Sequence, residues 1–544
     1  MYTLAIAQNF VYAKIGDYKM NNMSFSPLIQ ALLKEFEKGE TVSSDDRKIS
    51  VNPIVSRVAS LYEKLRNVMD YRDEEVILRA AIERILKRRF LLGGSGKTIA
   101  GPLVRELVWA RYFADESLPE SIIAKIEKEI DLFLNLREQI LGKHKTLKEK
   151  TVNEWIYHLM SSSIVHILGV MKRKEKMTNF MFEVIKNNIA IADDSDQTRD
   201  IQVFIAVHKA FAKDDLALLR YNLFRQYFGS LTDENVDKVA EKFLDGYKEI
   251  HYQFYYPAKD RILNYVKDKS AVFFILEDLL NLENGRIGEL YGDETGFKRV
   301  VNDICETRYA GISARVRRAI FRSVIFILLT KAFFALAIEA TFDRIVYGDI
   351  AWGALGANIA TPPILMALMG LLIKTPGQDN TDRIYHYIRT IFVTNQLRFE
   401  RPLLVKKNPP KTKPLLNFAF TMLWLATFFI VFGLIVYLLS KVHFTILSIG
   451  IFAFFLAIAS FLAYRTNQSA RIYLIEPRKS LAAPLIDFMF IPVVRVGRYL
   501  TTGISQINIF IYILDYVIEM PFKGISAFLE QWFYFLQAKR EELE

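Results

Sequence analysis

Apolar residues recur every three or four positions through most of the first 316 residues, which is the spacing of one face of an α-helix. In the segment that follows Asn52-Pro53, these positions are Val55, Val58, Leu61, Tyr62, Leu65 and Val68. Breakers such as Gly101-Pro102 and Gly142 separate the helical stretches, and strand signals are scarce. The pattern predicts an all-α fold for this large soluble part, either a multi-helix bundle or an irregular helical array.

One acidic run, Asp193-Asp194-Ser195-Asp196, interrupts this part of the chain. It is either a linker, which would divide residues 1–316 near 190–200, or a surface turn within one domain. It lacks the glycine and the terminal glutamate of a calcium-binding loop, so we interpret it as a solvated turn.

Four long apolar stretches lie between residues 317 and 466. The clearest runs from Pro414 to Ser440, which is 27 residues without a charge. A hydrocarbon core of about 30 Å requires about 20 helical residues, so this stretch is long enough to cross a membrane with tilt. We expect spans near 319–340, 350–373, 415–440 and 444–464, which together form an α-helical transmembrane domain over residues 317–480.

The last segment, residues 481–544, is apolar but interrupted. Asp487, Pro492 and Arg495 break the stretch 485–500, and the stretch 504–518 is shorter than a span requires. Further on, apolar residues again follow helical spacing: Phe522, Ile525, Phe528, Leu529, Trp532, Phe533 and Leu536. We expect amphipathic helices in the membrane interface. The alternatives are a fifth and a sixth span within 485–519, and a last helix packed on the soluble domain.

Charge is distributed unevenly along the chain. Residues 1–316 carry 47 Lys and Arg against 46 Asp and Glu, whereas residues 374–544 carry 19 against 11. The balanced soluble part argues against a nucleic-acid partner. The basic excess lies beside the apolar stretches, where anionic lipid headgroups attract it. The candidate headgroup contacts are Arg317, Arg318, Arg322, Arg398, Arg401, Lys406, Lys407, Arg495 and Arg498.

The same basic residues predict the topology. The segment before the first span, the loop between the second and third spans and the segment after the fourth span are basic, whereas the two remaining turns carry one basic residue each. Basic segments stay on the cytoplasmic side, so we expect both termini in the cytoplasm. Met1 to Ala13 lacks the basic leader of a signal peptide, and the single cysteine, Cys305, fits a reducing compartment.

Two motifs in the soluble part resemble functional sites. Gly96-Lys97-Thr98 ends like a phosphate-binding loop, but Leu91 replaces the first glycine and a basic helix replaces the preceding strand. Gly93-Gly94 more simply ends that helix. Glu154, His158 and His166 share one broad helix face, yet they need outside ligands to hold a metal ion, so partly buried core histidines are the preferred interpretation. We expect no cofactor.

Lys331 is the most informative single residue, because it lies near the middle of the first span. A central charge in a span usually faces protein or water. Glu339 lies eight residues further on, and we expect the rise to be too long for a direct pair on one straight helix. Asn358 and Thr361 lie in the second span, where Pro362-Pro363 frees backbone carbonyls. These residues form a candidate polar pocket between the first two spans, or Lys331 snorkels or bonds carbonyls of the second span.

Three segments carry a resemblance to a known group. They are Glu74 to Arg89, Gly503 to Asn508 and Ile518 to Lys523. Together they resemble segments of uncharacterised polytopic membrane proteins of candidate-phyla bacteria. The resemblance implies a bacterial inner-membrane location and supplies no chemistry.

Three functions are compatible with these features. The first is an integral membrane protein that anchors a cytoplasmic helical scaffold or binding domain, with a protein partner. The second is a small-solute transporter or channel, built by homo-oligomerisation, that uses the polar pocket around Lys331. The third is a membrane-embedded enzyme, for which His386, Asp382 and Arg383 are the only local cluster. No nucleophile and base pair is evident, so we do not expect an enzyme.

Overall fold

A computed structural model describes most of the chain. The residues it describes are 25–37, 47–53, 56–57, 59–60, 63–64, 74–91, 93–169, 172–282, 287–350, 352–394, 397–408, 414–442, 444–475, 483–506 and isolated positions between 524 and 539. They belong to two compact units. The first unit comprises Met1–Lys267, Ile391–Lys407 and Ile509–Glu544, and the second comprises Asp268–Thr390 and Asn408–Asn508.

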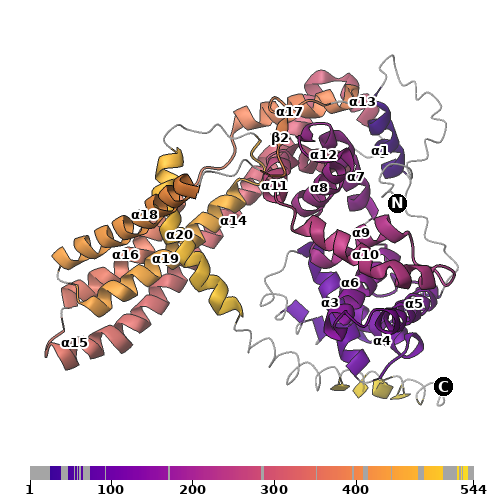
Figure 1. Ribbon diagram of the computed structural model, residues 1–544, viewed down its shortest axis with the longest axis horizontal. Helices are drawn as coiled ribbons and strands as arrows, with labels where there is room; N and C mark the ends of the chain where they lie inside the picture. The colour runs from indigo at the N-terminus through magenta and orange to yellow at the C-terminus, as the bar shows by residue number, and fades with distance from the viewer. Residues whose placement is uncertain are drawn as a thin grey trace. The chain divides into compact units, whose positions relative to one another are not determined.

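The first unit is helical, which confirms the predicted all-α fold (Figure 1). Its helices are α1 (Pro27–Glu37), α3 (Glu74–Leu91), α4 (Gly96–Trp109), α5 (Ser121–Lys143), α6 (Glu149–Ile167), α7 (Lys172–Lys186), α8 (Asp196–Val207), α9 (Leu216–Phe228), α10 (Val236–Phe254) and α11 (Lys259–Lys267), with a π-helical turn η1 (His208–Ala212) after α8. The helix expected after Asn52-Pro53 lies largely outside the described residues.

A short parallel pairing joins distant parts of the first unit. Strand β1 (Ile189–Ile191) pairs with strand β2 (Leu403–Val405), with Ala190 opposite Leu404. The acidic run predicted as a linker or a turn follows β1 directly, and Ser195 caps α8 by accepting a hydrogen bond from the Thr198 amide. Residues on both sides of this run belong to the first unit.

Helix α3 explains the basic stretch at residues 82–89. Its basic side chains are matched by acids that are themselves buried: Arg84 pairs with Glu63 at 2.9 Å, and Arg88 pairs with Glu106 at 2.6 Å. Pairing allows these carboxylates to be buried, because an unpaired buried charge is strongly destabilising. The stretch is therefore a core helix of the first unit.

The second unit holds the long apolar helices. Its elements are α12 (Ser270–Leu282), α13 (Ile287–Gly292), α14 (Glu294–Phe334), a π-helical turn η2 (Ala335–Glu339), α15 (Ala340–Val346), α16 (Trp352–Leu371), α17 (Gln378–Val393), whose last residues belong to the first unit, α18 (Pro414–Lys441), α19 (Ile446–Ala470) and α20 (Ala483–Gln506).

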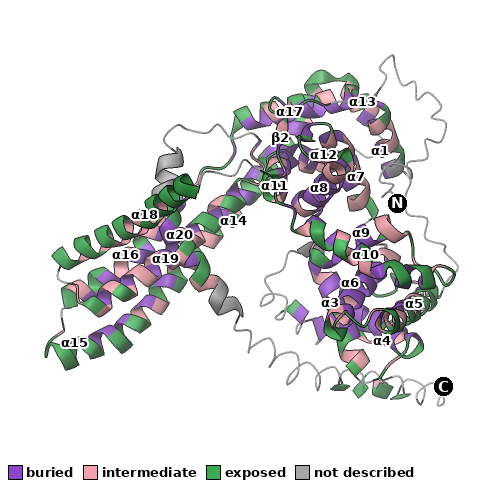
Figure 2. Cartoon of the chain, viewed as in Figure 1, coloured by how far each residue is buried: buried purple, intermediate pink, exposed green. Residues whose placement is uncertain are grey.

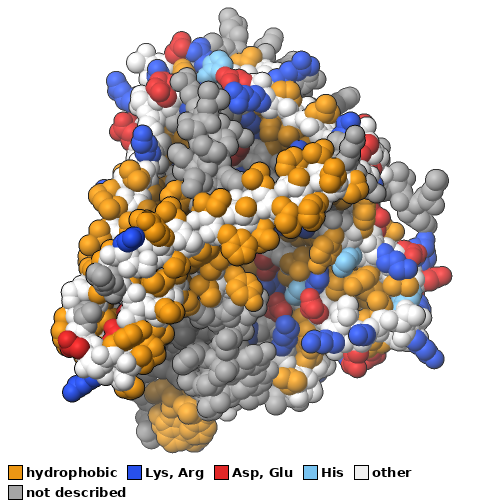
Figure 3. All heavy atoms as spheres, turned by 60° about the vertical axis from the view of Figure 1, so that its left-hand side comes forward, with side chains coloured by type: hydrophobic (Ala, Val, Ile, Leu, Met, Phe, Trp, Pro, Cys, Tyr) orange, Lys and Arg blue, Asp and Glu red, His pale blue; other side chains and the backbone are white. Residues whose placement is uncertain are grey.

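Four of these helices are long and apolar enough to cross a membrane, as the hydropathy pattern predicted. They are the continuous helix Glu294–Val346, α16, α18 and α19. The first of them has 53 residues, so the first span continues without a break a helix that begins at Glu294. Hydrophobic side chains cover much of the face of these helices that Figure 3 presents.

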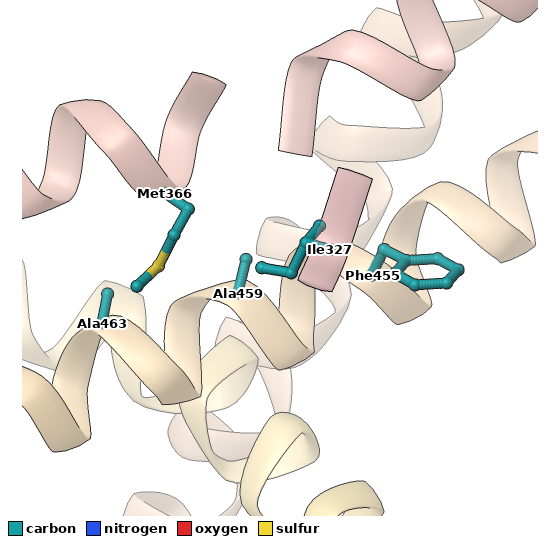
Figure 4. Packing of buried hydrophobic residues seen from close by; sticks show 5 residues of the cluster. All are labelled: Ile327, Met366, Phe455, Ala459 and Ala463. Carbon is teal, nitrogen blue, oxygen red and sulfur yellow. The ribbon is translucent and has the colours of Figure 1, made fainter. Parts of the chain in front are cut away.

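Three layers of apolar side chains hold α14, α16 and α19 together. One layer contains Ile312, Val316 and Ala470. The middle layer contains Ile327, Met366, Phe455, Ala459 and Ala463, and these side chains approach one another from three helices (Figure 4). The layer at the far end contains Ala335, Ala340 and Leu355. The order of the layers shows that α14 and α16 run antiparallel.

Helices α18 and α19 differ in burial, although both are strongly apolar. Helix α18 is exposed over most of its length, and Thr427 is its one buried residue (Figure 2). Helix α19 is instead packed into the middle layer through Phe455 and Ala459. Small residues of α19, such as Ala459 and Ala463, leave room for α14 and α16 to approach.

Helix α20 packs closely on α19. A Cβ atom at Gly497 would lie 2.0 Å from the carbonyl oxygen of Ala457, so glycine is needed for this approach. The Arg495 guanidinium lies 4.8 Å from the ring of Trp424 on α18. The stretch expected at 485–500 is thus part of one helix, while the stretch 507–523 and much of the expected last helix lie outside the described residues.

Candidate functional site

A buried ion pair lies inside the apolar layers of the second unit. Lys331, in the last turn of α14, places its Nζ atom 2.9 Å from Oε1 of Glu339, the last residue of η2. Both side chains are 0% exposed. The expectation that these two residues are too far apart for a direct pair was therefore wrong.

The π-helical turn is the physical reason. Eight residues of an ideal α-helix turn about 80° beyond two full turns and rise about 12 Å. A π-helical turn accommodates one extra residue, so the eight positions behave as seven and the angular offset falls to about 20°. The long side chains of Lys331 and Glu339 then bridge the remaining rise. The first span contains this turn at Ala335–Glu339, directly between the two charged groups.

Helix α16 adds a third polar group. The Asn358 amide donates from Nδ2 to Oε2 of Glu339 at 2.5 Å, and its Nδ2 lies 3.5 Å from the carbonyl oxygen of Ser448 on α19. Asn358 is also 0% exposed. The Glu339 carboxylate thus has one donor on each oxygen, and Asn358 links the network to all three packed helices.

An aromatic ring completes the surroundings of the ammonium group. Lys331 Nζ lies 5.3 Å from the centroid of the Phe455 ring on α19. A cation over an aromatic face is attracted to it, and the attraction grows when water is excluded. The Lys331 ammonium group therefore contacts a carboxylate and an aromatic ring. The sequence had suggested a polar pocket or the backbone carbonyls of the second span instead.

Thr361 does not join this network. Its hydroxyl donates to the carbonyl oxygen of Ala357, one turn earlier in α16, at 2.7 Å. Of the four residues proposed for the polar pocket, the structure brings three together, namely Lys331, Glu339 and Asn358.

Asp343 is a buried polar residue that the sequence reasoning missed. It lies in α15 four positions after Glu339, on the same helix face, and is 5% exposed. Its Oδ1 atom and Oδ1 of Asn358 are buried and have no hydrogen-bond partner. The spacing from Glu339 was the available signal, because residues four apart on a helix share a face.

The candidate headgroup contacts lie in different surroundings. Arg317, Arg318 and Arg322 are exposed on α14, next to the position where exposed apolar residues such as Phe321 and Phe326 begin. The other exposed members are Arg398, Arg401, Lys406, Arg495 and Arg498. Lys407 instead bonds Asp194 at 2.9 Å. Contact with lipid headgroups stays a prediction for all of them.

The Gly96-Lys97-Thr98 motif begins helix α4. The Gly96 amide donates to Oδ1 of Asp131 at 2.8 Å, so a carboxylate already lies at the helix N-terminus where a phosphate would bind. A Cβ atom at Gly96 would lie 2.4 Å from the Glu127 carbonyl oxygen. The glycine serves the close packing of α4 on α5, in agreement with the structural interpretation of this motif.

The three residues weighed as metal ligands belong to two separate ion networks. Arg220 bonds both Glu154 and His158 at 2.8 Å, so a guanidinium group lies between them. His166 lies 3.6 Å from Glu175. Burial is the main cause that lowers the pKa of both histidines, to about 4 for His158. Within the described part of the chain, no group of three or more metal-binding side chains occurs.

Comparison with known protein families, with curated proteins and with solved structures finds no match to this chain. The resemblance to polytopic membrane proteins of candidate-phyla bacteria therefore stays a prediction, and the function is inferred from the structure alone.

Proposed function

We propose that the protein is an integral membrane protein that holds a helical protein-binding domain at the cytoplasmic face of a bacterial inner membrane. One observation carries the proposal. Residues 391–407 lie between two helices that are able to cross a membrane, yet they fold as part of the first unit. The chain of the apolar unit thus passes through the helical unit, which gives that unit a second covalent attachment to the membrane segments.

Asn188 binds this segment in the first unit. Its Nδ2 donates to the Leu397 carbonyl at 2.7 Å, and its Oδ1 accepts from the Phe399 amide at 2.9 Å. Asn188 is buried, and its own carbonyl accepts from the Leu403 amide at 2.8 Å, at the start of the pairing between β1 and β2. A buried side chain that satisfies two backbone groups fixes their position, because leaving them unpaired costs free energy.

Charged contacts continue the attachment beyond β2. The Lys407 amide donates to Asp193 at 2.5 Å, and the Lys407 ammonium group bonds Asp194 at 2.9 Å. The same ammonium group lies 5.4 Å from the ring of Tyr252. Asp193 and Asp194 of the acidic run therefore bind Lys407 at the C-terminal end of the segment, before the chain returns to the apolar unit.

An aromatic surface on α10 supports a protein-binding role. Tyr247, His251 and Tyr255 stack in succession, with ring centroids 5.9 Å and 4.6 Å apart. Lys259 lies 5.1 Å from the Tyr255 ring, which is itself 68% exposed. Aromatic residues supply much of the binding energy of protein interfaces, so this aromatic ladder is the surface we assign to the partner.

The test uses the full-length protein in native membranes. A photo-crosslinking amino acid at Tyr255 should give a discrete adduct with one polypeptide, and the same group at the exposed Lys125 of α5 should not. Tyr255→Phe keeps an aromatic ring in the ladder and should preserve binding of the partner in a competition assay. Tyr255→Ser removes the ring and should lose this binding. If position 255 yields no adduct above the level at position 125, the proposed partner surface is wrong.

Transport of a small solute is a second candidate, favoured by the buried network of Lys331, Glu339 and Asn358. A transport path collects polar residues in a membrane, and these are the residues it would use. In proteoliposomes, Lys331→Leu should abolish flux of the solute. Flux that is unchanged in the variant, or that is absent from the wild type, counts against transport. If several copies of the chain form the path together, the protein should be a homo-oligomer in detergent.

The basic ends of the apolar helices support the orientation and the lipid partner. Soluble peptides that cover 374–413 should bind vesicles of anionic lipid and not of neutral lipid, and high salt should weaken the binding. Binding that does not depend on lipid charge would remove the anionic bilayer from the proposal.

A further inference from the structure

The buried face of the first apolar helix carries an excess negative charge. Lys331, Glu339 and Asp343 share this face and are 0%, 0% and 5% exposed. One ammonium group and two carboxyl groups leave a net charge of minus one when all are ionised. Lys331 bonds Glu339, so the excess charge belongs to Asp343.

Among the described residues of the helices packed against this face, none supplies the missing positive charge. Helix α16, from Trp352 to Leu371, contains no charged residue, and neither does α19 from Ile446 to Tyr464. Arg344 follows Asp343 directly but is exposed, and Lys441 at the end of α18 is exposed as well. Within the described part of the chain, the only salt bridge on this face joins Lys331 and Glu339.

Two oxygen atoms at this face lack a donor. Oδ1 of Asp343 and Oδ1 of Asn358 are both buried without a hydrogen-bond partner. Buried polar atoms in folded proteins nearly always have a partner, and each exception calls for an explanation such as a bound ion or water. Because Asn358 Nδ2 already bonds Glu339, its free Oδ1 lies inside the network.

The antiparallel packing of the helices places these two residues at similar depths in the second unit. Ala340 packs with Leu355, and Glu339 bonds Asn358, so α15 and the first half of α16 lie at the same depth. Side chains of a helix lean toward its N-terminus. From this rule we expect Asp343 to lean back toward Glu339 and Asn358 to lean toward the beginning of α16, which is the end next to Asp343.

We propose that Asp343 and Asn358 hold one exchangeable alkali-metal ion. One positive charge neutralises the face, whereas a divalent ion would leave it positive. An alkali-metal ion takes carboxylate and amide oxygens as ligands, as hard cations do. This site does not depend on a protein partner or on solute flux.

The experiment uses the full-length protein in nanodiscs of neutral lipid. Its thermal midpoint is measured with NaCl replaced by choline chloride at constant ionic strength and constant pH. The midpoint should rise by about 2–4 °C for each tenfold increase of Na⁺ above its Kd.

Two variants separate this site from other causes. Asp343→Asn removes the excess charge with little change of shape and should abolish the dependence on the cation. The matched control, Asp349→Asn, changes an exposed acid beyond the same helix and should retain it. A wild-type midpoint that does not respond to Na⁺ overturns the proposal, and so does an equal response in Asp343→Asn.

A second measurement does not depend on the folding of a variant. Infrared difference spectra of the wild type, recorded between Na⁺ and choline, report on a buried carboxylate. A shift of a carboxylate band on addition of Na⁺ supports the proposal. Spectra without this change overturn it.

Discussion

The Lys331 ammonium group lies 2.9 Å from the Glu339 carboxylate, although the two residues are eight positions apart on one helix. The π-helical turn Ala335–Glu339 aligns them, and Asn358 and Phe455 enclose them from two other helices. A lone charge at this depth would cost about 2.5–3.5 kcal/mol or more on insertion scales. The pair lets both residues be buried, and it fixes how three apolar helices pack.

Breaking this pair should strongly destabilise the protein. Lys331→Met leaves the Glu339 carboxylate buried beside Asn358 without a counter-charge, so we expect a loss of about 3–5 kcal/mol in the free energy of unfolding. Replacing both partners, as Lys331→Met with Glu339→Leu, should recover most of that loss. Denaturant unfolding in detergent measures both.

The exposed Arg344→Gln serves as the control for the ion pair and should leave the free energy of unfolding unchanged. If Lys331→Met and the double variant are equally unstable, the charges matter through packing and not through their pairing.

The contacts of Asn188 should control access to the segment at 397–407. Asn188→Ala leaves the Leu397 carbonyl and the Phe399 amide without their partner, at a local cost of about 2–4 kcal/mol. We expect trypsin to cleave after the exposed Arg398 much faster in this variant. The neighbouring Asn187 is exposed, so Asn187→Ala should cleave at the wild-type rate. Equal rates in the two variants would contradict the assigned role.

Gly497 should be intolerant of any side chain. In Gly497→Ala, the new Cβ atom meets the Ala457 carbonyl, so α20 has to move away from α19 at a cost of about 1–3 kcal/mol. A disulfide engineered across these two helices should then form more slowly. Gly433→Ala on α18 introduces a Cβ atom with no neighbour within 4 Å and should have no effect. A normal crosslinking rate in Gly497→Ala would show that α20 does not pack on α19 as described.

The stability of the first unit should fall in two steps as the pH is lowered. Burial, opposed by Glu83, lowers the pKa of His158 to about 4, so the unfolded chain takes up a proton first and stability is lost as the pH falls from about 6.5 to 4. For Glu83, burial raises the pKa, but Arg79 and Lys87 outweigh it and set the pKa at about 2, so a further loss occurs from about 4.5 to 2.

Substitution separates the two steps. His158→Gln should flatten the upper one, which amounts to about 2–3 kcal/mol, and Glu83→Gln the lower one. The measurement is denaturant unfolding of the full-length protein over a pH series. Burial also lowers the pKa of His166, so a smaller upper step should remain in His158→Gln. An upper step as large as in the wild type would assign it to another group.

Most of the architecture could be predicted from the hydrophobic pattern. The four apolar helices have the length that a bilayer requires, and the helical spacing in residues 1–316 produced the observed all-α fold. The pattern did not show that the first span continues a helix that starts at Glu294, because a polar and an apolar segment of one helix look separate in a hydropathy profile. It also did not distinguish α19 from α18, since lipid and a packed core select the same residues.

The polar site could be predicted only in part. Lys331, Glu339 and Asn358 are conspicuous as polar residues in apolar stretches, yet their direct contact depends on a π-helical turn that has no clear sequence signal. Asp343 lies beyond the span expected near 319–340, so the hydropathy pattern did not indicate that it is buried. The contacts of Asn188 with residues more than 200 positions away could not be derived from local patterns at all.

The central claim is that the second unit crosses a bilayer with its basic ends in the cytoplasm. Its most direct test is labelling of single cysteines in intact cells after Cys305→Ala, with Tyr347→Cys in the turn after α15 and Gly377→Cys in the loop after α16. We predict that an impermeant maleimide labels position 347 from outside and labels position 377 only after permeabilisation. Labelling in the reverse pattern, or release of the protein from the membrane by alkaline carbonate, would contradict the account.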